Sequence, residues 1–73
     1  MAEAPVRIGD CVYVGSQSII ASGVTIGTRC VVAANSFVND DVSDGIVVGG
    51  SPASRIGVVI GEAHEVRIVF DVS

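Results

Sequence analysis

An aliphatic residue recurs at every sixth position through the first half of this chain. The recurring positions are Ile8, Val14, Ile20, Ile26, Val32 and Val38. A strand alternates its side chains about every two residues and a helix about every 3.6, so neither element alone produces this period. A short fixed period is typical of a solenoid. The pattern therefore predicts a hexapeptide repeat in which each unit is a short strand followed by a turn.

Three such units complete one triangular coil, so residues eighteen positions apart stack on successive coils. This predicts that Ile8 lies under Ile26, with the coils about 4.8 Å apart, the usual strand spacing. A second set of compact residues is also expected to point inward: Val12, Ser18, Val24, Cys30, Ser36 and Val42. A small residue follows most of the aliphatic positions, because a large side chain would crowd the bend: Gly9, Gly15, Ala21, Gly27 and Ala33, with Asn39 as the exception. Gly, Asn and Asp tolerate positive φ, which predicts that conformation at Gly23, Asn35 and Asp41.

Two segments carry a resemblance to a known family: IGDCVYVGSQSIIASGVTIGTRCVVAANSFVNDDV (8–42) and IVVGGSPASRIG (46–57). They resemble the C-terminal half of the hexapeptide-repeat acyltransferases, including the maltose and galactoside and the xenobiotic acetyltransferases. The resemblance implies an all-β fold, a short left-handed parallel β-helix of about two coils. It predicts two parts: residues 1–57 form the β-helix with its Pro-Ala loop, and residues 58–73 form a divergent β tail.

The tail departs from the family pattern and reads as a strand, because apolar and other residues alternate in it. The alternating positions are Val66, Ile68, Phe70 and Val72. A turn at Gly61–Ala63 would join this strand to residues 58–60 as a hairpin. We expect the hairpin to cap the solenoid or to swap onto a neighbouring chain.

Outward positions of the repeat predict self-association. Tyr13 is expected to stack with Val31 on one face, and Ile19 with Phe37 on the next, whereas Thr25 and Ser43 mark a polar third face. Contiguous exposed apolar surface usually indicates an interface. Two adjacent apolar faces suit a threefold ring, which predicts a homotrimer.

Composition narrows the classes of partner. The chain has 73 residues and a net charge of −4, so nucleic acid and anionic membranes are not expected as partners. The sequence shows no signal peptide or transmembrane run, and we expect a cytoplasmic protein. Cys11 and Cys30 do not have a metal-binding spacing and are expected to be buried thiols.

The resemblance also implies a chemistry, the transfer of an acetyl group from acetyl-CoA to a hydroxyl. The family's catalytic histidine lies upstream of the segment equivalent to Pro5–Asp10, and the sole histidine here, His64, matches no family position. No catalytic residue is therefore assigned. The resemblance implies that Ser16, Ala34 and Asn39 contact the pantetheine arm of CoA, largely through backbone groups.

The charged CoA contacts of the family are altered in this chain. Asp40 replaces a family lysine, and Asp41 adds a second carboxylate that repels the CoA phosphates. Arg55 lies next to a family basic position and is expected to contact a phosphate instead. CoA binding is therefore predicted to be weak.

Two functional hypotheses remain open. The first is an acetyl-CoA-dependent O-acetyltransferase-like protein, a truncated or C-terminal portion that lacks the catalytic histidine and is inactive alone. The second is a non-catalytic trimeric β-helix scaffold or binding module. A zinc enzyme of the γ-carbonic anhydrase type fits poorly, because a zinc site needs three or four ligands and this chain has one histidine.

The inward register further predicts that Val14→Asp abolishes folding, because it would bury a carboxylate without a partner.

Overall fold

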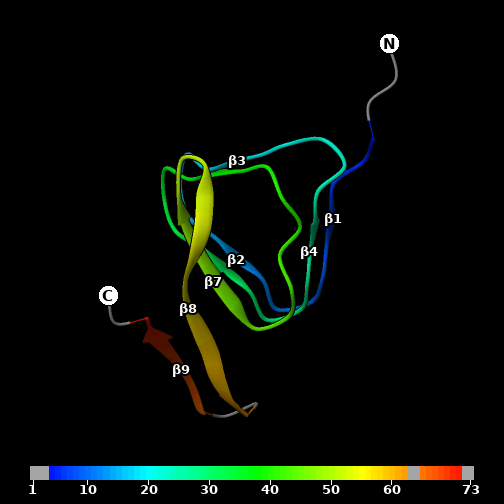
Figure 1. Ribbon diagram of the computed structural model, residues 1–73. Helices are drawn as coiled ribbons and strands as arrows, with labels where there is room; N and C mark the ends of the chain where they lie inside the picture. The colour runs from blue at the N-terminus through cyan, green and yellow to red at the C-terminus, as the bar shows by residue number, and fades with distance from the viewer. Residues whose placement is uncertain (1–3, 63–64, 72–73) are drawn as a thin grey trace.

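The structure, a computed structural model, describes residues 4–62 and 65–71 (Figure 1). These residues form strands and turns, and no helix. The strands are β1 (Arg7–Ile8), β2 (Tyr13–Val14), β3 (Ile19–Ile20), β4 (Thr25–Ile26), β5 (Val31–Val32), β6 (Phe37–Val38), β7 (Ile46–Gly50), β8 (Ala53–Glu62) and β9 (Glu65–Phe70).

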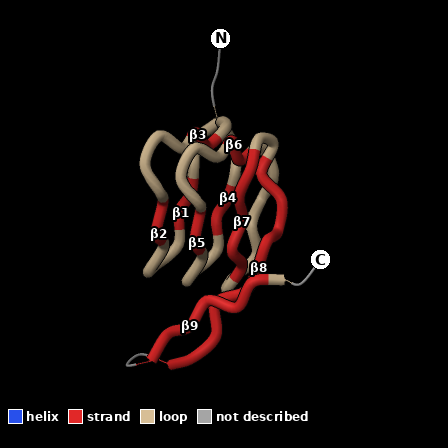
Figure 2. Tube along the Cα trace, turned by 90° about the vertical axis from the view of Figure 1, so that its left-hand side faces the viewer, coloured by secondary structure: helices blue, strands red, loops and turns tan. Residues whose placement is uncertain are grey.

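Strands β1 to β6 make two triangular coils that stack in parallel register (Figure 2). Strand β1 pairs with β4, β2 with β5, and β3 with β6. Within these ladders Ile8 faces Ile26, and Tyr13 faces Val31. The predicted stacking of residues eighteen apart is confirmed.

The core lies inside the second coil. Ile26, Val32 and Val38 are 1%, 0% and 2% exposed. Their counterparts in the first coil, Ile8 and Val14, are 51% and 38% exposed, because no described coil covers them on that side. Burial of an inward position therefore depends on its coil as well as on its place in the repeat.

Two serines also point inward, and each finds hydrogen-bond partners there. The Ser18 hydroxyl donates to the Ala33 carbonyl at 2.8 Å and accepts from the Ser36 amide at 3.4 Å. The Ser36 hydroxyl in turn accepts from the Gly50 amide at 3.2 Å. These bonds satisfy hydroxyl groups whose burial would otherwise be costly.

The corners of the coils repeat one backbone conformation. Positive φ of about 58° to 81° occurs at one residue in each of the first five corners: Cys11, Gln17, Gly23, Arg29 and Asn35. The prediction for Gly23 and Asn35 is confirmed. The prediction for Asp41 is wrong, because positive φ is not found there.

The prediction that both thiols are buried holds for Cys30 but is wrong for Cys11, whose corner position leaves it exposed.

The third coil is two residues shorter than the repeat predicts. Ile26 bridges Val42, and Val31 pairs with Val47, sixteen positions on in each case. Two carboxylates of this shortened segment accept hydrogen bonds from the coil before it. Asp41 Oδ1 accepts from the Thr25 amide, and Asp44 Oδ1 accepts from the Thr28 amide, each at 2.8 Å. Asp41 therefore lies against Thr25, at the place that an uninterrupted six-residue repeat would give to Ser43.

The tail forms the predicted hairpin. Strand β8 pairs antiparallel with β7 and then with β9. The turn was predicted too early, because β8 continues through Gly61 to Glu62; Ala63 and His64 lie outside the described residues. The β8–β9 hairpin projects beyond the coils in both views (Figures 1 and 2).

Candidate functional site

One corner of the β-helix brings two of the predicted cofactor-binding residues together. Ser16 follows β2, and Ala34 occupies the same place one coil later, after β5. The Asn35 amide donates to the Ser16 carbonyl at 2.9 Å, which fixes the spacing of the two turns. Both Ser16 and Ala34 are exposed. This corner column therefore presents its turn backbone to solvent.

The other two predicted residues lie elsewhere. Asn39 follows β6 and belongs to the next corner, while Arg55 lies on β8. The structure thus groups Ser16 with Ala34 and places Asn39 and Arg55 apart from that column. A ligand that contacts all four positions must extend beyond one corner of the coil.

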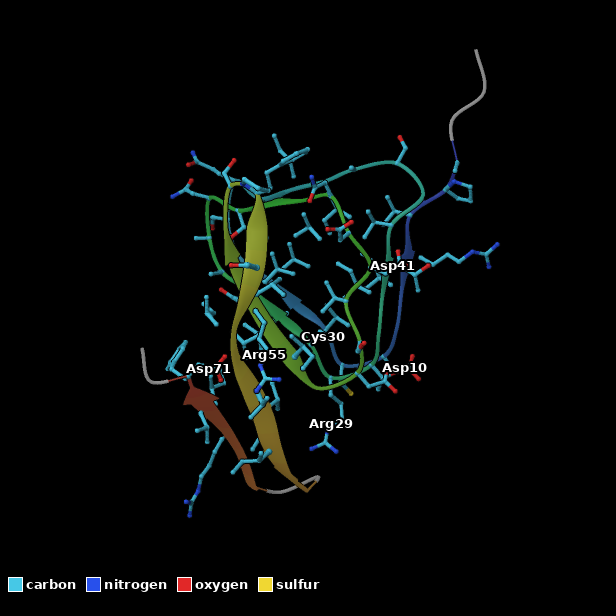
Figure 3. The ribbon with its side chains drawn as sticks, viewed as in Figure 1. Asp10, Arg29, Cys30, Asp41, Arg55 and Asp71 are labelled. Carbon is cyan, nitrogen blue, oxygen red and sulfur yellow. The ribbon has the colours of Figure 1, made fainter. Side chains whose placement is uncertain are left out.

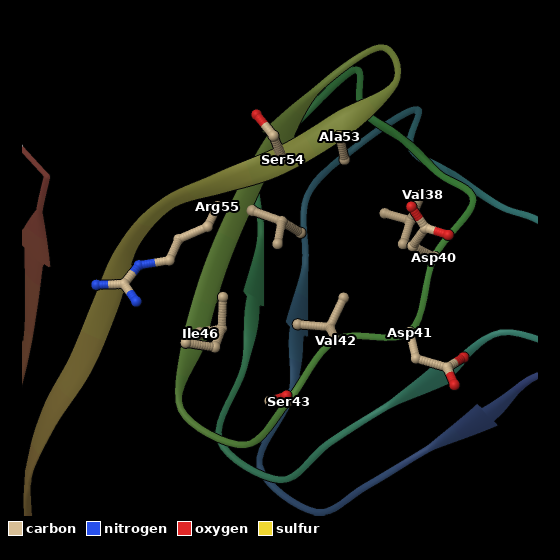
Figure 4. A pocket seen from close by; sticks show the side chains of 10 residues that line it. Val38, Asp40, Asp41, Val42, Ser43, Ile46, Ala53, Ser54 and Arg55 are labelled. Atoms are coloured by element: carbon tan, nitrogen blue, oxygen red, sulfur yellow. The ribbon is translucent and has the colours of Figure 1, made fainter. Parts of the chain in front are cut away.

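A cavity of about 460 Å³ lies at the end of the coils beside β8 (Figure 4). Its floor includes the apolar side chains of Val38, Val42 and Val48. Asp40 and Arg55 also line it, as the close-up shows. The sequence did not predict this cavity. It arises because the short third coil and β8 meet there, and the six-residue pattern does not specify that packing.

The guanidinium of Arg55 is already engaged by a carboxylate. Its Nε and Nη2 atoms donate to the Asp71 oxygens at 3.2 and 3.3 Å. The two side chains are 56% and 46% exposed, so solvent weakens the pair. Figure 3 shows Arg55 and Asp71 side by side between β8 and the end of the chain. A phosphate would have to compete with Asp71 for this cation.

Other classes of site receive little support from the described part of the chain. Within it, no group of three or more His, Cys, Asp or Glu residues is arranged to hold a metal ion. Cys30 is fully buried, and its thiol donates to the Ser43 carbonyl at 3.0 Å. No helix among the described residues is long and apolar enough to cross a membrane.

The coils match a known family. A protein-family model, the bacterial transferase hexapeptide (six repeats), matches residues 5–40. Residues 5–40 therefore carry the repeat that this family model describes. The chain is also 42% identical, over 64 residues, to the 2,3,4,5-tetrahydropyridine-2,6-dicarboxylate N-acetyltransferase of Staphylococcus aureus strain JH9. That alignment covers 88% of this chain and 25% of the relative.

Solved structures agree with the sequence comparison. A hexapeptide-repeat acetyltransferase from Vibrio cholerae, solved with acetyl coenzyme A, is 49% identical and superimposes with a TM-score of 0.74. The match covers 75% of this chain and 30% of that chain. A maltose O-acetyltransferase from Clostridium difficile 630 is 41% identical with a TM-score of 0.75, over 81% and 31% of the two chains.

These matches confirm the predicted resemblance to hexapeptide-repeat acetyltransferases. The fold is a left-handed parallel β-helix. The chain spans about a quarter to a third of the length of the relatives it matches.

Proposed function

We propose that this chain is an acetyl-CoA-binding segment of a hexapeptide-repeat acetyltransferase. The observation that carries the proposal is the match of its coils, at 49% identity, to a Vibrio cholerae acetyltransferase solved with acetyl coenzyme A. Bound acetyl-CoA would supply the activated acetyl group as a thioester. The proposed acceptor is the hydroxyl of a sugar or a xenobiotic, and the Clostridium difficile relative, an O-acetyltransferase by name, supports that choice.

The described residues fit one part of the cofactor better than the other. The exposed corner column of Ser16 and Ala34, with Asn39 at the next corner, suits an extended neutral arm held through backbone groups. The phosphate end fits poorly, because Asp40 and Asp41 line the cavity and Arg55 is paired with Asp71. We therefore propose weak binding in which Arg55 exchanges its carboxylate partner for a phosphate.

A general base is not assigned to this chain. Acetyl transfer needs a group within hydrogen-bond reach of the acceptor to take its proton. The one histidine, His64, lies outside the described residues and matches no family position. We propose that the chain alone binds acetyl-CoA without transferring the acetyl group, so a coupled assay with sugar acceptors should show no turnover.

Titration calorimetry with acetyl-CoA tests the binding proposal. Wild-type protein should bind one acetyl-CoA per chain at sub-millimolar to millimolar concentration. Asp40→Lys should tighten binding about tenfold, because it replaces a repelling carboxylate near the phosphates with a cation. Arg55→Glu should abolish the binding heat.

Asp10→Lys is the matched control, because it makes the same change of charge at an exposed corner of the first coil. Equal effects of Asp40→Lys and Asp10→Lys would show only a general effect of net charge. An absence of heat from wild type and Asp40→Lys alike, with 10 mM ligand, would overturn the proposal. It would favour the alternative of a non-catalytic scaffold, which the acidic cavity and the paired Arg55 also favour.

We also propose that three copies assemble through the two apolar outer faces. Tyr13 and Ile19 are 64% and 62% exposed, and they stack on the half-buried Val31 and Phe37 of the next coil. The third face carries Arg7 paired with Thr25, so the apolar surface is restricted to two sides. A threefold ring would cover both.

Phe37→Glu is expected to dissociate this trimer into monomers, because it places a carboxylate in the centre of the apolar contact. Sedimentation velocity should show the mass fall about threefold. Arg7→Glu, which introduces the same carboxylate on the polar face, should leave the trimer intact. An unchanged mass for Phe37→Glu would refute the assignment of this interface.

A further inference from the structure

Within residues 4–62 and 65–71, the outermost strand of the largest sheet has no pairing partner along one edge. The sheet has the order β2-β5-β7-β8-β9, so β9 pairs only with β8 among the described residues. Strand β9 spans six residues, Glu65–Phe70, whereas the opposite edge, β2, spans two. A six-residue edge without proline or a bulge can template pairing with another chain.

One face of this hairpin is apolar and uncovered. Val66, Ile68 and Phe70 alternate along β9 and are 58%, 43% and 59% exposed. Across the ladder they face Gly61, Val59 and Gly57 of β8, so no charged residue interrupts the face. Beyond Val58, which pairs with Ile46 of β7, strand β8 pairs only with β9 among the described residues, and a two-stranded stretch is marginally stable in water unless further strands are added. The hairpin that projects beyond the coils in Figures 1 and 2 therefore exposes apolar side chains that packing against another chain would bury.

We propose that β9 pairs antiparallel with β9 of a second copy of this chain, about a twofold axis at Val69. The result is a continuous four-stranded sheet with strand order β8-β9-β9-β8. This contact is separate from the outer faces of the coils proposed above for the trimer.

Backbone geometry limits the allowed registers. The Asp71 amide donates to the Ile56 carbonyl at 2.8 Å, so position 71 directs its backbone groups toward β8. Because these directions alternate along a strand, positions 66, 68 and 70 direct theirs toward the open edge. Antiparallel self-pairing must therefore join these even positions to one another. Among axes that leave at least two residues of 65–71 on each side, that condition allows one at Arg67, at Ile68 or at Val69.

The charges of β9 select one of these three axes. An axis at Arg67 opposes two arginines directly, and like charges in opposed positions destabilise a sheet. An axis at Ile68 sets Asp71 opposite position 65, a glutamate in the sequence. An axis at Val69 sets Ile68 opposite Phe70, and Arg67 opposite Asp71, whose carboxylate also accepts from Arg55 of its own chain. Only that register combines opposite charges with a matched apolar pair.

Single cysteines distinguish the three registers. In a Cys11→Ser background, which removes the exposed thiol, we would compare Val69→Cys, Ile68→Cys and Arg67→Cys under mild oxidation. Opposed non-hydrogen-bonded residues lie about 4.5 Å apart at Cα, within the range of a disulfide. Val69→Cys should form disulfide-linked dimers on a non-reducing gel, at least about tenfold faster than the other two variants.

Preferential cross-linking of Arg67→Cys or Ile68→Cys would overturn the proposed register. No cross-linking of any variant would overturn self-pairing, and would be expected if the hairpin packs on the coils of a neighbour instead. Val69 is 44% exposed, so the substitution removes little packing within one chain.

A change of charge gives a second measurement that needs no cysteine. Arg67→Glu places like charges opposite each other at both Arg67–Asp71 positions of the twofold pair. It should weaken the twofold association about tenfold in sedimentation equilibrium. Arg7→Glu, the same change on the coil, should have no effect. If Arg67→Glu and Arg7→Glu both associate as the wild type does, the pairing of Arg67 with Asp71 is refuted. Phe37→Glu, which changes the proposed coil interface and leaves β9 as it is, distinguishes that interface from the β9 contact.

Discussion

Val32→Asp is expected to abolish the cooperative unfolding transition of this protein. Val32 is fully buried in the second coil and packs within the apolar cluster of that coil. An unpaired carboxylate there costs on the order of 5 kcal/mol, counting desolvation and lost packing. A chain of this length is stabilised by about 0.05–0.15 kcal/mol per residue, so that loss is comparable to the whole. Circular dichroism during thermal and urea unfolding measures it.

Val14→Asp is the matched control, since Val14 pairs with Val32 at the same point of the preceding coil. The repeat alone predicted that this substitution abolishes folding. Val14 is 38% exposed, however, so the structure revises the expected loss to about 1 kcal/mol with a cooperative transition retained. Equal loss in both variants would show that the first coil is covered as fully as the second.

Gly15→Ala is expected to lower the free energy of unfolding by about 2–3 kcal/mol through overpacking. A Cβ at this position would lie 2.5 Å from the Ala34 nitrogen and 2.8 Å from the Ala34 Cα. These are backbone atoms, and the hydrogen bond from Asn35 to Ser16 holds the two turns together. The melting temperature should fall by about 10–20 °C, on the scale of about 4–8 °C per kcal/mol for a small domain.

The next hexapeptide supplies the control for this change. Ala21 occupies the equivalent position there, so that corner accepts the Cβ which Gly15 lacks. Ala21→Gly should cost about 0.5–1 kcal/mol, mainly through backbone entropy. A neutral Gly15→Ala would mean that the two coils lie farther apart at this corner than the structure shows.

The coils were predictable because their determinant is local. Each hexapeptide carries its own inward aliphatic residue, and all but the last, which has Asn39, carry a small residue directly after it, so the units repeat the same steric requirement. The pairing of Ile20 with Val38 therefore follows from counting residues. Positive φ at Cys11, Gln17 and Arg29 was missed, because the corner imposes this conformation on residues that do not favour it.

The candidate site was only partly predictable. The stacking of Ser16 and Ala34 in one column follows from the repeat. The pairing of Arg55 with Asp71 does not, because it joins β8 to the residue after β9 across a hairpin whose register the sequence alone does not specify. The cavity beside Asp40 depends on the same hairpin and on the short third coil.

The sequence by itself determined the period, the inward and outward faces and the resemblance to hexapeptide-repeat acetyltransferases, because these properties repeat within every six residues. Only the tertiary structure decided where the repeat shortens, with Val42 bridging Ile26 and the carboxylates of Asp41 and Asp44 bonding to the coil below. It also decided that, among the described residues, β9 pairs along one edge only. Both depend on contacts between segments far apart in the chain, which no local pattern encodes.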